Sequence, residues 1–180
     1  MFSNKALKKL ILPLIIEQIL IMAVGVADTV MVSYAGEVAI SGVGLVDMFN
    51  NLIITVLAAI DAGGAIIVSQ YIGNKDRKNA NKASSQLLTI TIVIATVIML
   101  GCLVFHRILL STFFGAIEMD VMKAATTYFL ISAISFPFLG VYNSAAALYR
   151  SMEKTRTTMY VSILMLSLIH ISEPTRLRRI

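Results

Sequence analysis

The sequence predicts an all-α membrane protein, a polytopic helix bundle with four complete transmembrane helices and the start of a fifth. Of its 180 residues, 58% are hydrophobic and only 14% are charged, whereas a soluble domain has roughly 25% charged residues. The apolar residues also form long stretches separated by short polar ones, which is typical of segments that cross a bilayer. Together these features argue against a soluble enzyme, a nucleic-acid-binding module and a disordered chain.

The first span is predicted at residues 10–32, after a short basic segment. At ~1.5 Å per residue it reaches about 34 Å, enough to cross a hydrocarbon core of ~30 Å. A secretory signal peptide is the alternative, but its apolar region is shorter, about 7–15 residues. This span also contains two acids, Glu17 and Asp28, which disfavours a signal peptide. We expect Pro13 to lie at the opening of the helix.

Three further complete spans and the truncated start of a fifth follow, and the stretches between them, among them the polar segment 73–85, are predicted to be connectors. We expect Pro137 and Gly140 to act as kink points in the fourth span. The single cysteine, Cys102, excludes an internal disulfide and fits a small buried packing residue. The later spans are predicted at residues 43–72, 86–105, 121–148 and 158–165.

The distribution of lysine and arginine predicts the orientation. Ten basic residues lie on the side that holds the N-terminus and the connectors after the second and fourth spans, against two near the other side. Because cytoplasmic loops are enriched in lysine and arginine, we expect a multi-pass plasma-membrane protein with a cytoplasmic N-terminus. This topology accounts for the net charge of +5 without a nucleic-acid partner. The ten are Lys5, Lys8, Lys9, Lys75, Arg77, Lys78, Lys82, Arg150, Lys154 and Arg156, and the two are Arg107 and Lys123.

Polar and ionisable residues inside the spans are the candidate functional residues. An aspartate at the centre of a span costs at least ~2.5–3.5 kcal/mol on insertion scales, so such residues mark functional sites by default. Glu17 and Asp28 are eleven residues apart and share one helix face, and Asn50 and Asp61 in the second span have the same spacing. We interpret the two stripes as facing a polar cavity between the first two helices; the alternative is helix-end solvation with interhelical hydrogen bonds. Gln70 completes the set.

Enzymatic signatures are absent from the sequence: it contains no P-loop, GxSxG, HExxH or paired-cysteine motif. We therefore expect no embedded enzyme and no cofactor.

Three stretches of the chain combine distinctive residues in a fixed order. The first span reads LPLIIEQILIMAVGVADTVMV, the second ends in AGGAIIVSQYIGNKD, and the fourth ends in YNSAAALYRSMEKTRTTMY. Together they resemble the multidrug and toxic compound extrusion (MATE) family, and the resemblance covers residues 5–165. Asp28 lies where that family has its first-helix aspartate, the second stretch is like the family's small-residue stretch and basic loop, and the third is like the arginine loop before its fifth helix.

The resemblance implies a transporter of twelve helices in two six-helix lobes, monomeric when complete, of which this chain holds four helices and part of a fifth. It implies export of lipophilic, often cationic, compounds in exchange for H⁺ or Na⁺, with the bilayer and these small substrates as partners. The polar positions of helix five that complete the family's first-lobe cation site are missing. We therefore expect residues 1–165 to be inactive alone.

Asp28 is the residue that we expect to couple ion and substrate movement. Buried among apolar helices, it would take a proton from outside and release it inside, and the change of charge would bias alternating access. A sodium ion would use the same carboxylate with neighbouring oxygens, and the sequence does not choose between the two ions.

Two alternatives remain at this point. A lipid-linked oligosaccharide flippase of the same superfamily would be expected to line its cavity with arginines, and the first four spans contain no central lysine or arginine. A membrane scaffold that does not transport gains nothing from carboxylates in its spans. Both are therefore disfavoured against the antiporter.

The C-terminal segment 166–180 is expected to be non-native, which leaves residues 1–165 as the genuine protein. Residues 166–176 read LSLIHISEPTR, the in-frame translation of a common transposase sequencing adapter. Ile180 fits the fixed codon that follows the adapter's variable index. We assign no function to this segment.

Overall fold

The computed structural model is all helical over the residues that it describes, as the composition predicts. It describes the backbone of residues 4–115 and 117–177, and the side chains within this part except those of residues 4–7, 9, 10, 166 and 168–177. Four of the helices, α1 to α4, are long and apolar enough to cross a membrane. The helices are α1 (Asn4–Ser33), α2 (Glu37–Gly73), α3 (Arg77–Phe114), α4 (Met119–Ser151) and α5 (Thr155–Leu177).

The helices extend well beyond the predicted spans, so the boundaries of the connectors were wrong. The polar segment 73–85, expected to be a loop, belongs to α3 from Arg77 onward. An apolar window marks the part of a helix that lies in hydrocarbon, but the local hydrogen bonds of a helix continue through Lys, Arg and Ala without cost. Pro13 likewise lies inside α1, which begins at Asn4, and does not open it.

Asp76 fixes the start of α3. Its Oδ1 accepts a hydrogen bond from the Asn79 backbone N–H at 3.1 Å, and its Oδ2 accepts one from the Asn79 side-chain amide at 2.7 Å. The bond from the backbone N–H is the main reason that the pKa of Asp76 lies below its ordinary value. The stabilisation that such a cap gives to the helix is lost as pH falls through the lowered pKa, because the protonated carboxyl accepts hydrogen bonds less well.

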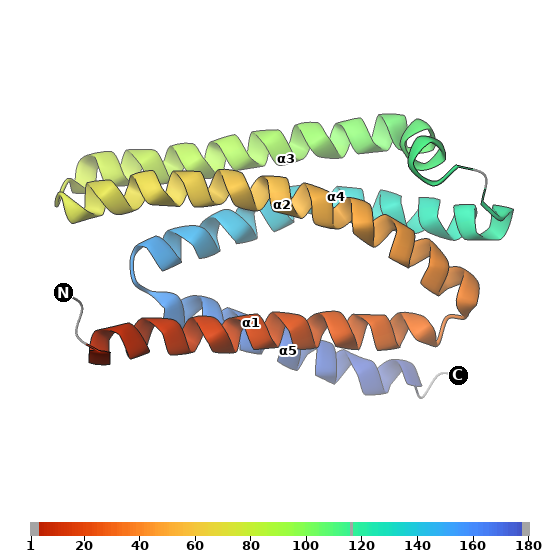
Figure 1. Cartoon of the computed structure of the whole chain (residues 1–180), viewed down its shortest axis with the longest axis horizontal. Coiled ribbons are helices and arrows are strands. Elements are labelled where there is room, and N and C mark those ends of the chain that lie inside the picture. The colour runs from red at the N-terminus through yellow and green to blue at the C-terminus, as the bar shows by residue number, and fades with distance from the viewer. Residues whose placement is uncertain (1–3, 116, 178–180) are drawn as a thin grey trace.

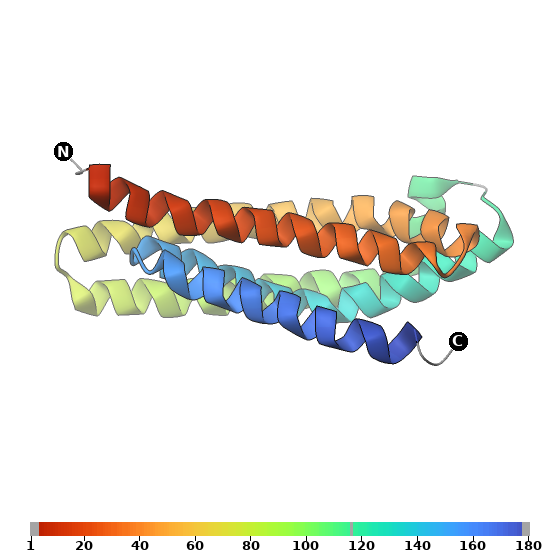
Figure 2. The ribbon, with the colours of Figure 1, turned by 90° about the horizontal axis from the view of Figure 1, so that it is seen from below.

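The helices run alternately up and down the bundle (Figures 1 and 2). Helices α2, α3 and α4 pack together, and α1 lies mainly against α5. The N-terminus and the α2–α3 and α4–α5 turns lie at one end, and the α1–α2 and α3–α4 connections lie at the other (Figure 1). The three basic segments of the sequence therefore gather at one end of the bundle, as the topology predicted.

The core lies between α2, α3 and α4. Fully buried Val46 and Leu57 of α2 pack with Phe129 of α4 and with Cys102 of α3, which is the buried packing residue that the sequence predicts. Phe49 meets Phe129 edge-on at a ring-centroid distance of 5.2 Å. Aromatic pairs in this geometry add to the stabilisation given by buried area.

Glycines allow the core helices to approach closely. A Cβ on Gly140 would lie 3.2 Å from Thr91 and 3.3 Å from Ala95, so this glycine is a contact point between α3 and α4. Helix α4 runs unbroken from Met119 to Ser151, so Pro137 and Gly140 do not end it. Small residues at helix contacts are the usual means of close packing in membranes.

Gly42 provides a test of this packing. Alanine at this position would place its Cβ 2.9 Å from the backbone nitrogen of Ala125, so the backbone of α2 or α4 must move. We expect Gly42→Ala to destabilise the fold by about 1–3 kcal/mol, the range for overpacking. Gly44→Ala in the same helix meets open space and is the matched control. Thermal unfolding, followed by the reaction of buried Cys102 with a thiol dye, measures both; equal melting temperatures for the two variants would contradict the packing.

Candidate functional site

Asp61 joins the three helices of the core. Its side chain is 2% exposed on α2. Its Oδ1 accepts hydrogen bonds from the Thr91 hydroxyl of α3 at 2.9 Å and from the Ser144 hydroxyl of α4 at 2.5 Å. Its Oδ2 is buried and has no hydrogen-bond partner among the described residues. One carboxyl group thus holds α2, α3 and α4 together inside a segment that crosses the membrane.

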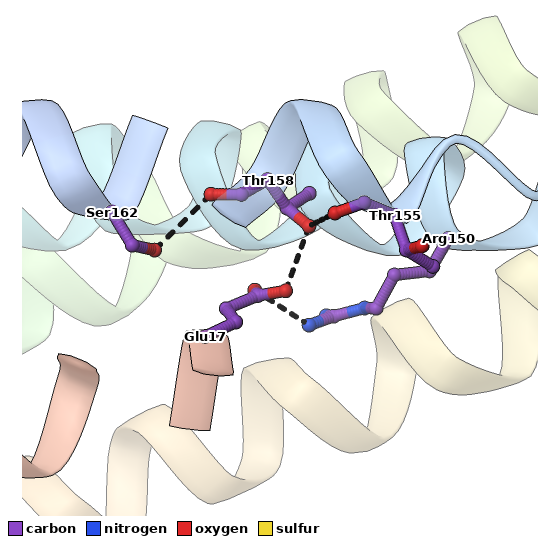
Figure 3. A network of polar contacts seen from close by, with 5 residues as sticks. All are labelled: Glu17, Arg150, Thr155, Thr158 and Ser162. Atoms are coloured by element: carbon purple, nitrogen blue, oxygen red, sulfur yellow. Dashed lines mark hydrogen bonds and ion pairs between the residues drawn. The ribbon is translucent and has the colours of Figure 1, made fainter. Parts of the chain in front are cut away.

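Glu17 forms a second polar network, which links α1 to α4 and α5 (Figure 3). The Glu17 side chain is 1% exposed, and its Oε1 accepts from the Arg150 guanidinium at 3.3 Å. Its Oε2 accepts from the Thr158 hydroxyl at 2.7 Å. The same hydroxyl lies 2.9 Å from the Thr155 carbonyl, but its one hydrogen can go to only one acceptor. The Ser162 hydroxyl extends the network by donating to the Thr158 carbonyl at 3.2 Å.

The carboxyls of Glu17 and Asp61 do not face a common cavity between the first two helices. The structure differs here from our interpretation of the two polar stripes. Glu17 is held by the end of α4 and by α5, and Asp61 by α3 and α4. Spacing fixes which residues share a face of a helix, but it does not determine which neighbour that face meets. The alternative, interhelical hydrogen bonding, describes both contacts. Arg150, counted with the loop cations in the sequence, is the partner of Glu17.

Asp28 is exposed on α1, whereas we expected apolar helices to bury it. No described side chain forms an ion pair or hydrogen bond with it. The nearby acid Asp47 of α2, by contrast, accepts a hydrogen bond from the Tyr128 hydroxyl of α4 at 3.1 Å. The described helices leave this side of α1 uncovered because α1 packs mainly against α5.

The remaining two candidates of α2 do not join either network. The Oδ1 of Asn50 is buried without a hydrogen-bond partner among the described residues. Gln70 is exposed near the end of α2 and makes no side-chain hydrogen bond within the described part of the chain. The sequence did not identify the residues that donate to the two carboxyls, which are Thr91, Ser144 and Thr158. The only indication in the sequence is that each is a hydroxyl residue within or beside an apolar span.

A cavity of about 340 Å³ lies between α2 and α4. Asp61 and Ser69 line it from α2, and Asn143 and Arg150 line it from α4, with small apolar residues between them. The ionisable groups in this lining are thus the Asp61 carboxyl and the Arg150 guanidinium. Among the described residues, no group of three or more His, Cys, Asp or Glu side chains is placed to hold a metal ion.

The ion pair of Glu17 predicts a measurable coupling energy. Arg150→Ala leaves a buried carboxylate without its cation, and we expect it to lower the free energy of unfolding by about 1–3 kcal/mol, less than for a fully buried pair because the Arg150 side chain is 38% exposed. The cost should shrink when Glu17→Gln is already present. Arg156→Ala, exposed at the same end, is the control. Thermal unfolding of the single and double variants measures the coupling, and additive costs would contradict the contact.

Comparison with known proteins identifies relatives along nearly the whole chain. The MatE family model matches residues 13–172. The chain is 27% identical over 172 residues to the uncharacterized transporter YisQ of Bacillus subtilis, covering 90% of this chain and 37% of that protein. It is 29% identical over 162 residues to a probable multidrug resistance protein NorM of Thermotoga maritima, covering 88% of this chain and 34% of that protein. The chain thus spans about a third of the length of the relatives that it matches.

Solved structures share the fold. A MOP superfamily transporter from Pyrococcus furiosus superposes with a TM-score of 0.82 at 21% identity, over 91% of this chain and 36% of that one. An outward-facing multidrug resistance MATE family transporter of the same superfamily gives the same values. Because the family model matches most of the residues of this chain, the chain belongs to the MatE family.

Proposed function

We propose that the protein is a secondary antiporter that exports lipophilic, often cationic, compounds in exchange for H⁺ or Na⁺. The observation that carries the proposal is Asp28, an acidic residue inside a membrane-spanning helix with no ion-pair partner among the described residues. Ionisable groups in such positions mark ion or substrate pathways. The relatives from Thermotoga maritima and Halalkalibacterium halodurans are named probable multidrug resistance proteins, which supports the same activity.

In the proposed mechanism, Asp28 exchanges its ion as the transporter alternates between outward-facing and inward-facing states. Binding of a proton or of Na⁺ neutralises the carboxylate and changes which surroundings α1 prefers. Glu17 is proposed to transmit this change, since its contacts with Arg150 and Thr158 tie α1 to α4 and α5. Asp61, Asn50 and Gln70 are proposed as further polar residues of the pathway.

A lipid-linked oligosaccharide flippase fits the described residues less well. Recognition of a pyrophosphate head group calls for several guanidinium or ammonium groups, because both phosphates carry negative charge. Among the described residues that line the α2–α4 cavity, Arg150 is the one cation, and it is bound to Glu17. A membrane scaffold that does not transport is also a poorer fit than an antiporter, because it gives no role to the costly carboxylate of Asp28 inside α1.

The plasma membrane is proposed as the location, with the basic end of the bundle in the cytoplasm. We expect a cysteine at Asn81, in the first turns of α3, to resist an impermeant thiol reagent added to intact cells. A cysteine at Asp120, at the other end of the bundle, should react. Both are placed in a Cys102→Ala background. Strong labelling at position 81 with none at position 120 would reverse the topology.

Asp28→Asn tests the coupling role in the complete transporter. Asparagine keeps the size and hydrogen-bonding capacity of the side chain but removes its titration and its charge. We expect coupled efflux to fall to the level of cells without the transporter, while Asp28→Glu retains part of it. Asp120→Asn makes the same chemical change at an exposed residue outside the bundle core and should leave efflux unchanged.

The measurement is substrate efflux under an imposed H⁺ or Na⁺ gradient, together with the amount of protein in the membrane. Efflux by Asp28→Asn at the parental rate and with the parental ion dependence would show that Asp28 is only a structural polar residue.

Residues 1–165 expressed alone should not raise drug tolerance, because a cavity between two lobes requires both.

A further inference from the structure

We propose that Asp61 is a buried proton-binding site, separate from Asp28, at the junction of α2, α3 and α4. The geometry that points to this site is the Asp61 carboxyl, which is 2% exposed. Its Oδ1 accepts two hydrogen bonds, and its Oδ2 has no hydrogen-bond partner among the described residues. This second oxygen, Oδ2, belongs to a side chain that lines the cavity between α2 and α4.

The hydrogen bonds of Asp61 fit the neutral acid. A carboxylate has about four acceptor positions on two oxygens. Thr91 and Ser144 both donate to Oδ1, and no described group donates to Oδ2. As a carboxylate, the group would carry an unpaired charge inside a membrane-spanning segment, which costs far more than an unpaired neutral hydroxyl. As an acid, Oδ2 carries the proton and Oδ1 is the carbonyl oxygen that accepts both hydroxyls.

The surroundings of Asp61 supply no cation to hold its charge. The stretches of α3 and α4 that pack around it, residues 83–105 and 124–149, contain no lysine, arginine, histidine, aspartate or glutamate. Arg150 lines the same cavity, but its guanidinium donates to Glu17 of α1. The partners of Asp61 described in the structure are therefore the two hydroxyls alone.

A proton fits this place better than a larger ion does. A sodium ion requires several oxygen ligands around it, but the side-chain oxygens described beside Asp61 are only the hydroxyls of Thr91 and Ser144, and both donate to Oδ1. An organic cation would need open access to Oδ2, which has less than 1 Å² of accessible surface. A proton needs neither a ligand shell nor an open approach for a large group.

Proton loss at Asp61 has a structural consequence. The charged form requires new donors for Oδ2, and water entering the neighbouring cavity of about 340 Å³ is the available source. The neutral form thus belongs to the tightly packed arrangement of α2 and α4, and the charged form belongs to a hydrated one. Proton binding here is independent of the proposed antiport, whereas its use during transport would rest on that function.

Infrared difference spectroscopy of the complete protein in lipid nanodiscs tests the proposal. A protonated carboxylic acid has a carbonyl stretching band that the carboxylate lacks. We expect such a band at neutral pH, its loss at high pH, and its absence in Asp61→Asn. Asp120→Asn, which makes the same chemical change at an exposed residue, is the matched control and should keep the band. Because the readout is a spectrum, it does not depend on whether the protein exports drugs.

Two further variants keep the test independent of folding. Ser144→Ala and Thr91→Ala retain Asp61 but each removes one donor to Oδ1, so the carbonyl band should persist and move to higher frequency. Circular dichroism checks that the helices remain. A band that is unchanged by Asp61→Asn, or that neither hydroxyl variant moves, would overturn the proposal. Loss of the band on adding Na⁺ at constant pH would overturn the preference for a proton.

Discussion

A polar group inside the bilayer has no water to satisfy it, and this constraint determines which helices of the chain are neighbours. Each of the two buried carboxyls finds its donors on other helices. Asp61 of α2 accepts from α3 and α4, and Glu17 of α1 accepts from α5 and from Arg150 near the end of α4. Apolar packing alone gives little direction in lipid, where hydrocarbon surrounds every helix. These two sets of polar contacts therefore give the bundle a defined arrangement.

The polar and apolar contacts also divide the bundle into two parts, the core of α2, α3 and α4 and the pair of α1 and α5. The core of α2, α3 and α4 has both tight apolar packing and the enclosed hydrogen bonds of Asp61. Helices α1 and α5 pack on each other, and the side-chain hydrogen bonds that tie α1 to α4 and α5 centre on Glu17, near the middle of α1. Asp28 lies further along the same helix, on an uncovered face. A helix that is fastened near its middle and carries an exposed charge closer to its end is suited to move when that charge is neutralised.

The sequence predicts the architecture better than the site, and particular residues show why. Apolar length and the distribution of lysine and arginine are properties of each segment, so the number, order and alternating direction of the helices follow from them. The helix boundaries were too short, as at Arg77, because hydropathy reports the membrane and not the helix. Asp61 and Glu17 could be selected as costly residues in apolar spans. Their partners Thr91 and Thr158 could not, because neutral hydroxyls occur throughout such spans and only the packing chooses between them.

The central claim, that the complete protein exchanges a substrate for an ion, is tested most directly by reciprocal fluxes in proteoliposomes. An imposed H⁺ or Na⁺ gradient should drive a fluorescent lipophilic cation across the membrane against its own gradient. A gradient of that substrate, imposed alone, should in turn drive the same ion in the opposite direction. The first flux should disappear when the ion gradient is collapsed by an ionophore. Substrate movement that is indifferent to both ion gradients, or no ion movement in response to substrate, would contradict the account.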